Sequence, residues 1–457
     1  TFSANLFSLF VAYQALALAA FPLVAHRGDE EARPAARAFL ATLLASSIGL
    51  FLPAMIWTYA ISGALDFRAG GMLAGRVDAL TANILLVLYV MGIAMAANLF
   101  TLFIFYEVLT FSTYPLVTHK GDPAARRAGR IYLAVLVGAS VALFLPGIIG
   151  VALTAGSTNF VAGGLLDGKV GENTGNLLLI LLVFGAAKAA LMPLHGWLPS
   201  AMVAPAPVSA LLHAVAVVKA GVFVILKVSA YTFGPDLITR LPASTWLLWI
   251  AAGSIVIASL VAMTKDDLKA RLAWSTVGQL SYVTSAALLP VGAGLIAGGL
   301  HIVFHAVAKI TLFMCAGAIY VATGATRVSE MHGLGRRMPV VFACFLIGAI
   351  SVIGLPPFAG MWSKFLLISA AFGTREWWTA AAMIVSSLLG LLYLAPVGLR
   401  ALLPPVGDAP PREFIRPDGA RGPMVAAIII TAAASLALFF LADPLAAYLA
   451  PIRGGAR

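Results

Sequence analysis

Residues 184–219 of this chain read FGAAKAALMPLHGWLPSAMVAPAPVSALLHAVAVVK. The segment is almost wholly apolar, yet it carries Lys188 near one end and Lys219 at the other, with four prolines between them. Proline removes a backbone donor and interrupts a helix. A lysine beside a break in an apolar helix is typical of membrane proteins in which broken helices line a polar cavity within the bilayer.

The composition of the whole chain supports a membrane protein. Of its 457 residues, 61% are hydrophobic and only 10% are charged, whereas a soluble domain has about 25% charged residues. Apolar runs long enough to cross a bilayer recur throughout, and lipid forces such runs to be helices. We predict an all-α polytopic membrane protein with about 13 transmembrane helices. The spans fall near 5–25, 37–62, 80–97, 99–117, 130–154, 176–194, 206–231, 244–264, 272–290, 294–323, 340–373, 377–402 and 423–449.

The net charge of +11 does not indicate a nucleic-acid partner, because the basic residues stand singly in short loops, as the cytoplasmic bias of Lys and Arg places them. Cys315 and Cys344 lie in apolar spans and are expected to be small core residues, not a disulfide or a metal site. We expect a multi-pass protein of the cell (inner) membrane. The basic loops expected on the cytoplasmic side are 118–130, 264–271, 324–339 and 400–422.

The N-terminal part contains an internal repeat. Residues 5–77 align without gaps to 98–170, and close to half of the aligned residues are identical. This indicates a tandem duplication of a two-helix unit. The copies differ at one functional position, since Gln14 stands where the second copy has Glu107. The basic loop 26–37 does not fit the alternation of the later loops, so the orientation of the first copy stays open.

Glu107 lies in the middle of an apolar span. An ionisable group inside a bilayer costs about 2.5–3.5 kcal/mol on insertion scales and tends to mark an ion pathway. We interpret Glu107 as a carboxylate that loads or pairs with a moving charge. The alternative is a protonated, hydrogen-bonded core residue.

Two lysines follow the same pattern in the two parts of the chain. Lys188 precedes the proline cluster, and Lys364 follows Pro356-Pro357 within the span 340–373, which is too long for one crossing and should be a broken helix. Lys188 paired with Glu107 could exchange its proton through a switch in that pairing. A static ion pair that only holds helices together is the alternative.

Histidines and lysines recur on the helices between these two lysines. His301, His305 and Lys309 are spaced at i, i+4 and i+8 and therefore form one stripe on a helix. His213 and Lys219 share one span but point to different faces of it. Because histidine can donate or accept a proton near neutral pH, the stripe predicts a proton relay. A metal site and core histidines satisfied by neighbours are the alternatives.

These residues lie in motifs that resemble a known family, the antiporter-like subunits shared by Mrp-type cation/proton antiporters, respiratory complex I and membrane-bound hydrogenases. The resemblance covers about residues 78–449 and is greatest to the D-type subunit of Mrp antiporters. The motifs that carry it are Asn98-Leu99-Phe100 with Glu107, Lys188 through Trp197-Leu198-Pro199, Ala204-Pro205-Ala206-Pro207-Val208-Ser209-Ala210 with His213, Asp267-Leu268-Lys269, and Gly354-Leu355-Pro356-Pro357 with Lys364.

The resemblance implies a fold of two inverted five-helix repeats with broken helices. It also implies that Glu107 and Lys188 form a paired site and that Lys364 is the exit-side lysine. The connecting axis would consist of Lys219, His213, His301, His305 and Lys309. The resulting domain boundaries are 1–77 for the N-terminal helix pair that duplicates 98–170, 78–232 and 244–402 for the two repeats, and 423–449 for a C-terminal transmembrane helix.

The function expected is a proton-translocating subunit of a multi-subunit Na⁺ or K⁺/H⁺ antiporter, with other membrane subunits as partners. Two alternatives stay open: a proton-pumping subunit of a complex I-like or hydrogenase redox complex, and a coupling subunit of a bicarbonate-uptake assembly. The sequence has no Gly-rich phosphate loop, nucleophile elbow, haem motif or cysteine cluster. We therefore expect no cofactor and no metal in this chain, and whether it belongs to an enzyme depends on its partners.

Overall fold

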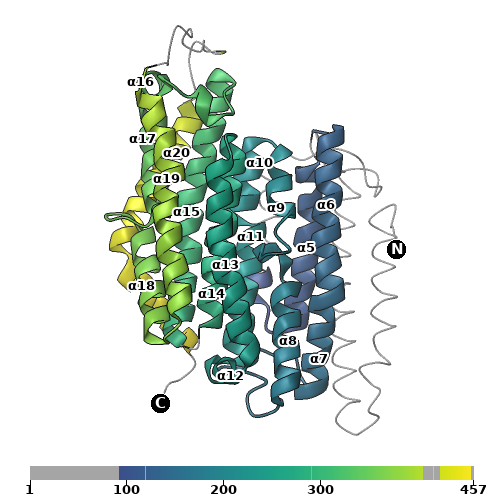
Figure 1. Cartoon of the computed structure of the whole chain (residues 1–457). Helices are drawn as coiled ribbons and strands as arrows, with labels where there is room; N and C mark the ends of the chain where they lie inside the picture. The colour runs from purple at the N-terminus through teal and green to yellow at the C-terminus, as the bar shows by residue number, and fades with distance from the viewer. Residues whose placement is uncertain (1–91, 119, 290, 405–414, 416–421, 454–457) are drawn as a thin grey trace. The chain divides into compact units, whose positions relative to one another are not determined.

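The computed structural model describes residues 92–118, 120–289, 291–404, 415 and 422–453 (Figure 1). Within these ranges the regular elements are helices, and strand pairing is limited to two isolated bridges. In the part of the chain that the structure describes, seven helices are long and apolar enough to cross a membrane. The predicted all-α polytopic membrane fold is therefore confirmed. The predicted helix pair at 1–77 lies outside the described residues, and the total of 13 spans stays a prediction.

The chain divides into two compact units, and the first comprises residues 1–187 and 227–243. Two helix N-termini in the described part of this unit are capped by short polar side chains: Asn98 accepts from the Thr101 amide at 2.7 Å, and Asp122 accepts from the Ala125 amide at 2.6 Å. The helices that lie wholly within this unit are α5 (Leu99–Val117), α6 (Pro123–Ala139), η2 (Ser140–Phe144), α7 (Leu145–Ala155), α8 (Glu172–Gly185), η6 (Ser229–Phe233) and α12 (Pro235–Arg240).

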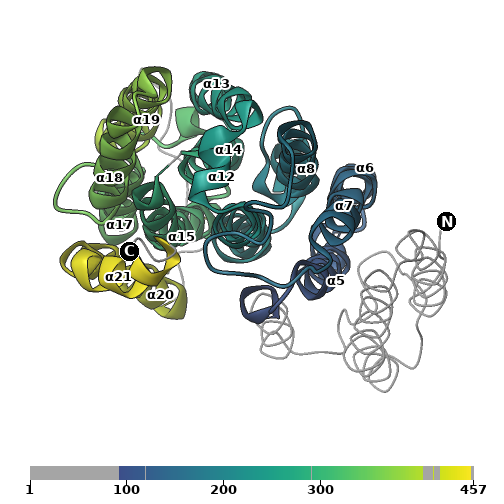
Figure 2. The ribbon, with the colours of Figure 1, turned by 90° about the horizontal axis from the view of Figure 1, so that it is seen from below.

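The second unit comprises residues 188–226 and 244–457. Its centre is the long helix α15 (Gly292–Thr323), which packs against α14 (Leu268–Leu288), α17 (Pro339–Ile353), α18 (Gly360–Gly373) and α20 (Gly422–Phe440) (Figures 1 and 2). The other elements wholly within this unit are α9 (Trp197–Ser200), η4 (Ala201–Val203), α10 (Ala206–Ala210), η5 (Leu211–Val215), η7 (Val328–Glu330), α16 (Leu334–Arg337), α19 (Trp377–Leu402), α21 (Ala442–Leu449) and η8 (Ala450–Arg453). Three elements have residues in both units: η3 (Ala187–Ala189), α11 (Val217–Val228) and α13 (Pro242–Thr264).

Both predicted helix breaks are present. The helix α8 ends at Gly185, so Lys188 lies in the short turn η3, outside any long helix. The span 340–373 divides into α17 and α18, and Gly354 ends α17 with a φ of +93°. Pro356 and Pro357 follow the end of α17 within a few residues and cannot continue the hydrogen-bond ladder. The other break comes earlier than the prolines predict, because α8 ends at Gly185, before Lys188 and well before Pro193.

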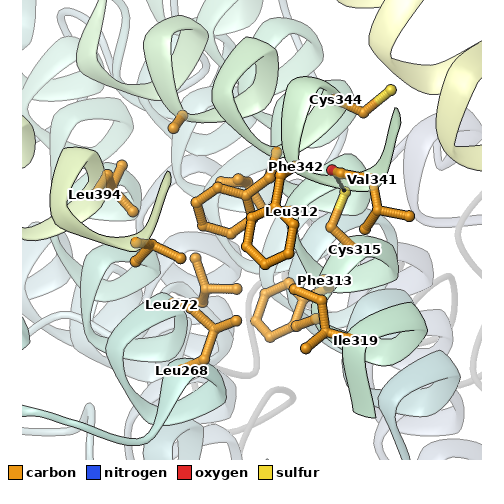
Figure 3. Close-up of a cluster of buried hydrophobic side chains, with 14 of the residues drawn as sticks. Leu268, Leu272, Leu312, Phe313, Cys315, Ile319, Val341, Phe342, Cys344 and Leu394 are labelled. Atoms are coloured by element: carbon orange, nitrogen blue, oxygen red, sulfur yellow. Dashed lines mark hydrogen bonds between the residues drawn. The ribbon is translucent and has the colours of Figure 1, made fainter. Parts of the chain in front are cut away.

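A cluster of buried apolar side chains holds α14, α15, α17 and α19 together (Figure 3). Cys315 and Cys344 are both buried in it, as predicted for core residues, and the Cys315 thiol donates to the Val341 carbonyl at 3.3 Å. The other labelled members of the cluster are Leu268, Leu272, Leu312, Phe313, Ile319, Phe342 and Leu394.

The charged loops that follow α13 and α15 lie side by side. Asp266 accepts from the Ser329 amide at 3.0 Å and from the Ser329 hydroxyl at 2.6 Å. Burial alone would raise the pKa of Asp266, but the two hydrogen bonds from Ser329 hold this pKa below its ordinary value. Arg271 donates to the Lys265 carbonyl at 2.7 Å and to the Tyr393 carbonyl at 2.9 Å, which joins this end of α14 to α19.

Exposed tryptophans mark the opposite ends of two of these helices. Trp246 and Trp249 lie near the start of α13, and Trp377 and Trp378 begin α19, while the charged loops adjoin the other end of each helix. Tryptophan is enriched where a helix passes through the membrane–water interface, and Lys and Arg are enriched on the cytoplasmic side. The tryptophans therefore mark an interface at the ends of these helices that lie away from the charged loops, and the cytoplasmic placement of loops 264–271 and 324–339 stays a prediction.

Candidate functional site

The stripe of His301, His305 and Lys309 lies along the buried side of α15. All three side chains are at most 3% exposed. The two imidazole rings stack, with centroids 5.7 Å apart and planes at 8°. The i, i+4, i+8 spacing therefore places three titratable groups in succession through the interior of the second unit, as the sequence predicted.

Lys219 on α11 joins this stripe from the side. Its Nζ lies 2.5 Å from Nδ1 of His305, a direct contact between groups 86 residues apart in the sequence. His213 lies apart from the stacked rings. Its ring packs against Phe313 with centroids 5.4 Å apart, and within the ranges that the structure describes neither of its ring nitrogens has a hydrogen-bond partner.

Lys309 is the last residue of the stripe, and its ammonium group contacts α14. Its Nζ donates to the Leu272 carbonyl at 3.0 Å and to the Ser275 hydroxyl. Both acceptors are neutral. The lysine is thus satisfied by hydrogen bonds alone, with no counter-charge among the described residues.

Lys364 on α18 lies near the His301 end of the stripe, opposite to Lys309. Its Nζ donates to the Ile353 carbonyl, which the helix break leaves free of the α17 ladder, and to the Ser387 hydroxyl, each at 3.0 Å. The same ammonium lies over the ring of Tyr282, 4.9 Å from its centroid. Tyr282 in turn stacks on His301, with centroids 5.5 Å apart and planes at 10°.

Ser363 supports His301 from α18. The Ser363 hydroxyl lies 3.0 Å from Nδ1 of His301 and 3.1 Å from the Gly360 carbonyl. When the hydroxyl donates to the carbonyl, Nδ1 must carry the imidazole proton and Nε2 is left as an acceptor. Nε2 of His301 and Nε2 of His305 are buried and have no hydrogen-bond partner within the described ranges. In neutral His301 the nitrogen available for a proton is therefore Nε2, whereas in His305 it is Nδ1, which faces Lys219.

We name the buried succession Lys364, Tyr282, His301, His305 and Lys219 the central line. Within the described residues, neither lysine of the central line forms an ion pair with a carboxylate. Two unit charges a few ångströms apart repel by several kcal/mol, about 4 kcal/mol at 4 Å in an effective dielectric of about 20. A proton bound to one group of the central line therefore lowers the proton affinity of the neighbouring groups. This coupling is the condition for charge to move along the line.

Tyr282, Ser363 and Ser387 are site residues that reasoning from sequence missed. A signal for Tyr282 was present, because its helix α14 carries an unusual number of hydroxyl and amide side chains for an apolar span. Seven of them are fully or almost fully buried: Ser275, Thr276, Gln279, Ser281, Tyr282, Thr284 and Ser285.

Glu107 and Lys188 are both buried, at 7% and 0% exposure. Glu107 lies in the middle of α5 in the first unit, and Lys188 lies in the turn η3 in the second. Their pairing stays a prediction. Close packing holds the backbone at Lys188 in place, since a Cβ on Gly221 would lie 2.3 Å from the Lys188 carbonyl carbon.

The position of Gly354, next to the side chain of Lys364, leaves no room for a Cβ atom, and this gives a first testable prediction. A Cβ at this position would lie 2.6 Å from Cδ of Lys364, and the φ of +93° disfavours any side chain. We expect Gly354→Ala to destabilise the protein by about 1–3 kcal/mol, measured as a lower thermal unfolding temperature. The control is Gly253→Ala in α13, where a Cβ meets open space. Equal unfolding temperatures for the two variants would contradict the proposed crowding.

A transmembrane family described as NADH:quinone oxidoreductase/Mrp antiporter matches residues 3–97 and, separately, 96–390. NAD(P)H-quinone oxidoreductase chain 5 of Synechocystis is 32% identical over 332 residues, which are 66% of this chain and 46% of that protein. NADH-quinone oxidoreductase subunit N of Desulforudis audaxviator is 34% identical over 314 residues, which are 66% of this chain and 60% of that protein. The chain thus spans about half the length of the curated relatives it matches.

Among solved structures, a chain of the Mrp complex from Dietzia sp. DQ12-45-1b is similar with a TM-score of 0.72. The similarity covers 98% of this chain and 92% of that chain at 22% identity, which speaks for the fold alone. The family match extends over most of the chain and includes every residue of the central line. The resemblance stated from the motifs is confirmed, and the chain belongs to the transmembrane family of NADH:quinone oxidoreductase and Mrp antiporter subunits.

Proposed function

We propose that this chain is the proton-translocating membrane subunit of a multi-subunit monovalent cation/H⁺ antiporter, with Na⁺ or K⁺ as the exchanged ion. The observation that carries the proposal is the central line itself. Titratable side chains from α11, α15 and α18 meet in a buried interior, within hydrogen-bond or stacking distance of one another and of Tyr282. Ionisable groups are costly at such positions and for that reason tend to mark an ion pathway.

The geometry supports a stepwise proton transfer. A protonated Lys219 donates to Nδ1 of His305, so transfer across this contact would leave a neutral lysine and an imidazolium. His301, whose ring stacks on that of His305, is the next titratable group, and Lys364 lies beyond Tyr282. Because stacked rings share no hydrogen bond, a bridging water would have to carry the proton from His305 to His301. Lys309 stands beside the line and, when charged, would raise the energy of a proton on His305.

The remaining site residues take the roles that the family resemblance implies. We propose that Glu107 and Lys188 form a charge pair whose opening and closing sets the protonation of the line. His213 lies within electrostatic range of Lys309 and Lys269 and would extend the line toward the basic loop 264–271. We place the protein in the cell membrane with other membrane subunits as partners.

A second candidate function is a proton-pumping subunit of a redox-driven complex. It is favoured by the two curated relatives, which are named as quinone oxidoreductase chains. In that case the same line would move protons, but the driving reaction would take place in partner subunits. A coupling role in a bicarbonate-uptake assembly would leave the line intact while making cation exchange unnecessary.

The test is gradient-driven proton flux in vesicles that contain the purified assembly. We expect an imposed Na⁺ or K⁺ gradient to move protons, and His301→Phe to lower this flux about tenfold or more, because phenylalanine keeps the aromatic stack but cannot carry a proton. The matched control is His332→Phe, at a histidine outside the line, with flux close to wild type. Flux that requires quinone reduction and ignores cation gradients would favour the redox complex. Equal flux in His301→Phe and wild type would overturn the proton path.

A further inference from the structure

We propose that Tyr282 is a positioning residue for proton exchange between Lys364 and His301, and that its ring acts as a shared electrostatic platform for the two. This rests on the function proposed above and deepens it by adding a residue that carries no exchanged proton. Tyr282 belongs to α14, while its two neighbours come from α18 and α15. It is fully buried.

The contacts of Tyr282 give its ring two roles at once. The ammonium of Lys364 lies 4.9 Å from the ring centroid, within the range of a cation–π interaction. The imidazole of His301 stacks nearly parallel to the ring, at 5.5 Å. The π system of one ring would therefore stabilise a proton on Lys364 and also a proton on His301. The two groups would not both be charged at once without cost, because adjacent cations repel each other.

The hydroxyl of Tyr282 fixes the ring in place and is not itself a relay. It donates to the Met383 carbonyl at 2.6 Å, which occupies its only proton. The Ser387 hydroxyl, an acceptor for Lys364, lies 3.4 Å away. The phenol proton is thus committed to the Met383 carbonyl, and the ring can face both cationic partners without the phenol losing its proton.

The other groups around Lys364 are neutral or cationic. From α15, His301, His305 and Lys309 act on it electrostatically, and each of them disfavours its charge when protonated. From α17 and α19 it meets the Ile353 carbonyl and the Ser387 hydroxyl. Because no described carboxylate pairs with Lys364, the aromatic face is a substantial part of what stabilises its charged form.

The experiment compares Tyr282→Leu with Tyr282→Phe in the complete assembly. The readout is the ¹⁵N NMR signal of Nζ of Lys364 as a function of pH, assigned by its loss in Lys364→Met. Leucine removes the π face, so we expect the midpoint of the Lys364 titration to fall by about one pH unit, a tenfold change in the protonation equilibrium. Phenylalanine keeps the π face, so its midpoint should stay within a few tenths of a unit of wild type. Tyr282→Met, with a flexible apolar side chain, serves if the leucine variant does not assemble.

The second readout is the pH profile of proton flux, whose alkaline limb should shift in the same direction in the leucine or methionine variant only. Unchanged titration midpoints in those variants would overturn the role of Tyr282 even if flux is normal. A shifted midpoint in an assembly that shows no cation-driven flux would support the platform and overturn the proposed function instead. A shift of equal size in Tyr282→Phe would assign the effect to the hydroxyl and also contradict the proposal.

Discussion

Replacing Glu107 by glutamine is expected to abolish ion-dependent proton flux, with a loss of about 100-fold or more, equivalent to about 2.7 kcal/mol in the transfer barrier. The amide keeps the size of the side chain and its capacity to accept hydrogen bonds, but it cannot hold a charge or a proton. Glu107 is buried in a helix that contains no other charged residue, so no neighbouring carboxylate of α5 can replace it. The measurement is the initial rate of pH change in vesicles after a Na⁺ or K⁺ jump.

The duplicated N-terminal segment supplies a matched control for this prediction. Gln14 occupies the position of Glu107 in the first copy of the repeat, so Gln14→Ala should leave flux nearly intact if only the second copy moves charge. The reciprocal variant, Gln14→Glu, should not rescue Glu107→Gln. If Gln14→Ala and Glu107→Gln lost equal flux, the two copies would not differ in function and this assignment would be wrong.

Lys219→Met is expected to have an effect of similar size, again about 100-fold. Methionine preserves much of the volume of the lysine stem but removes the ammonium that contacts Nδ1 of His305 at 2.5 Å. Without it, His305 loses its only hydrogen-bonded proton donor among the described residues, and a proton would have to reach the line from a more distant group. Flux per assembled complex should therefore fall while the complex stays intact on size-exclusion chromatography.

Lys227→Met is the control for this prediction. It also removes a lysine from α11, but it leaves the contact between Lys219 and His305 in place. Lys227 donates to the carbonyls of Ala94 and Ala96 and lies over Phe160, and none of these contacts involves a residue of the central line. Lys227→Met should lower thermal stability but retain most of the flux per folded complex. A loss of flux in Lys227→Met as large as in Lys219→Met would contradict the specific role of the His305 contact.

Much of the site could be predicted because membrane proteins place strong constraints on sequence. Lipid tolerates few charges, so Glu107, Lys188, Lys219 and Lys364 stood out against apolar surroundings. Helical periodicity then placed His301, His305 and Lys309 on one face, and all three are buried together. Prolines indicated the breaks beside Lys188 and Lys364, and both breaks are present.

The partners of these groups could not be predicted in the same way. Serine is compatible with an apolar helix, so Ser387 did not differ visibly from a core residue, and the polar composition of α14 did not by itself single out Tyr282. His213 and Lys219 share one helical span, yet Lys219 meets His305 while His213 packs on Phe313. Which of two residues on one helix faces a third depends on the rotation of that helix against its neighbours, and local patterning leaves this rotation undefined.

Local chemistry was therefore enough to establish an all-helical membrane chain, its broken helices and the identity of its ionisable residues, because each follows from the cost of exposing polar groups to lipid. Tertiary structure was needed to order those residues into a line, since Lys219 and His305 are 86 positions apart and Tyr282 joins α18 to α15 from a third helix. Contacts of that kind form only when helices pack, because packing sets distances that sequence spacing does not contain.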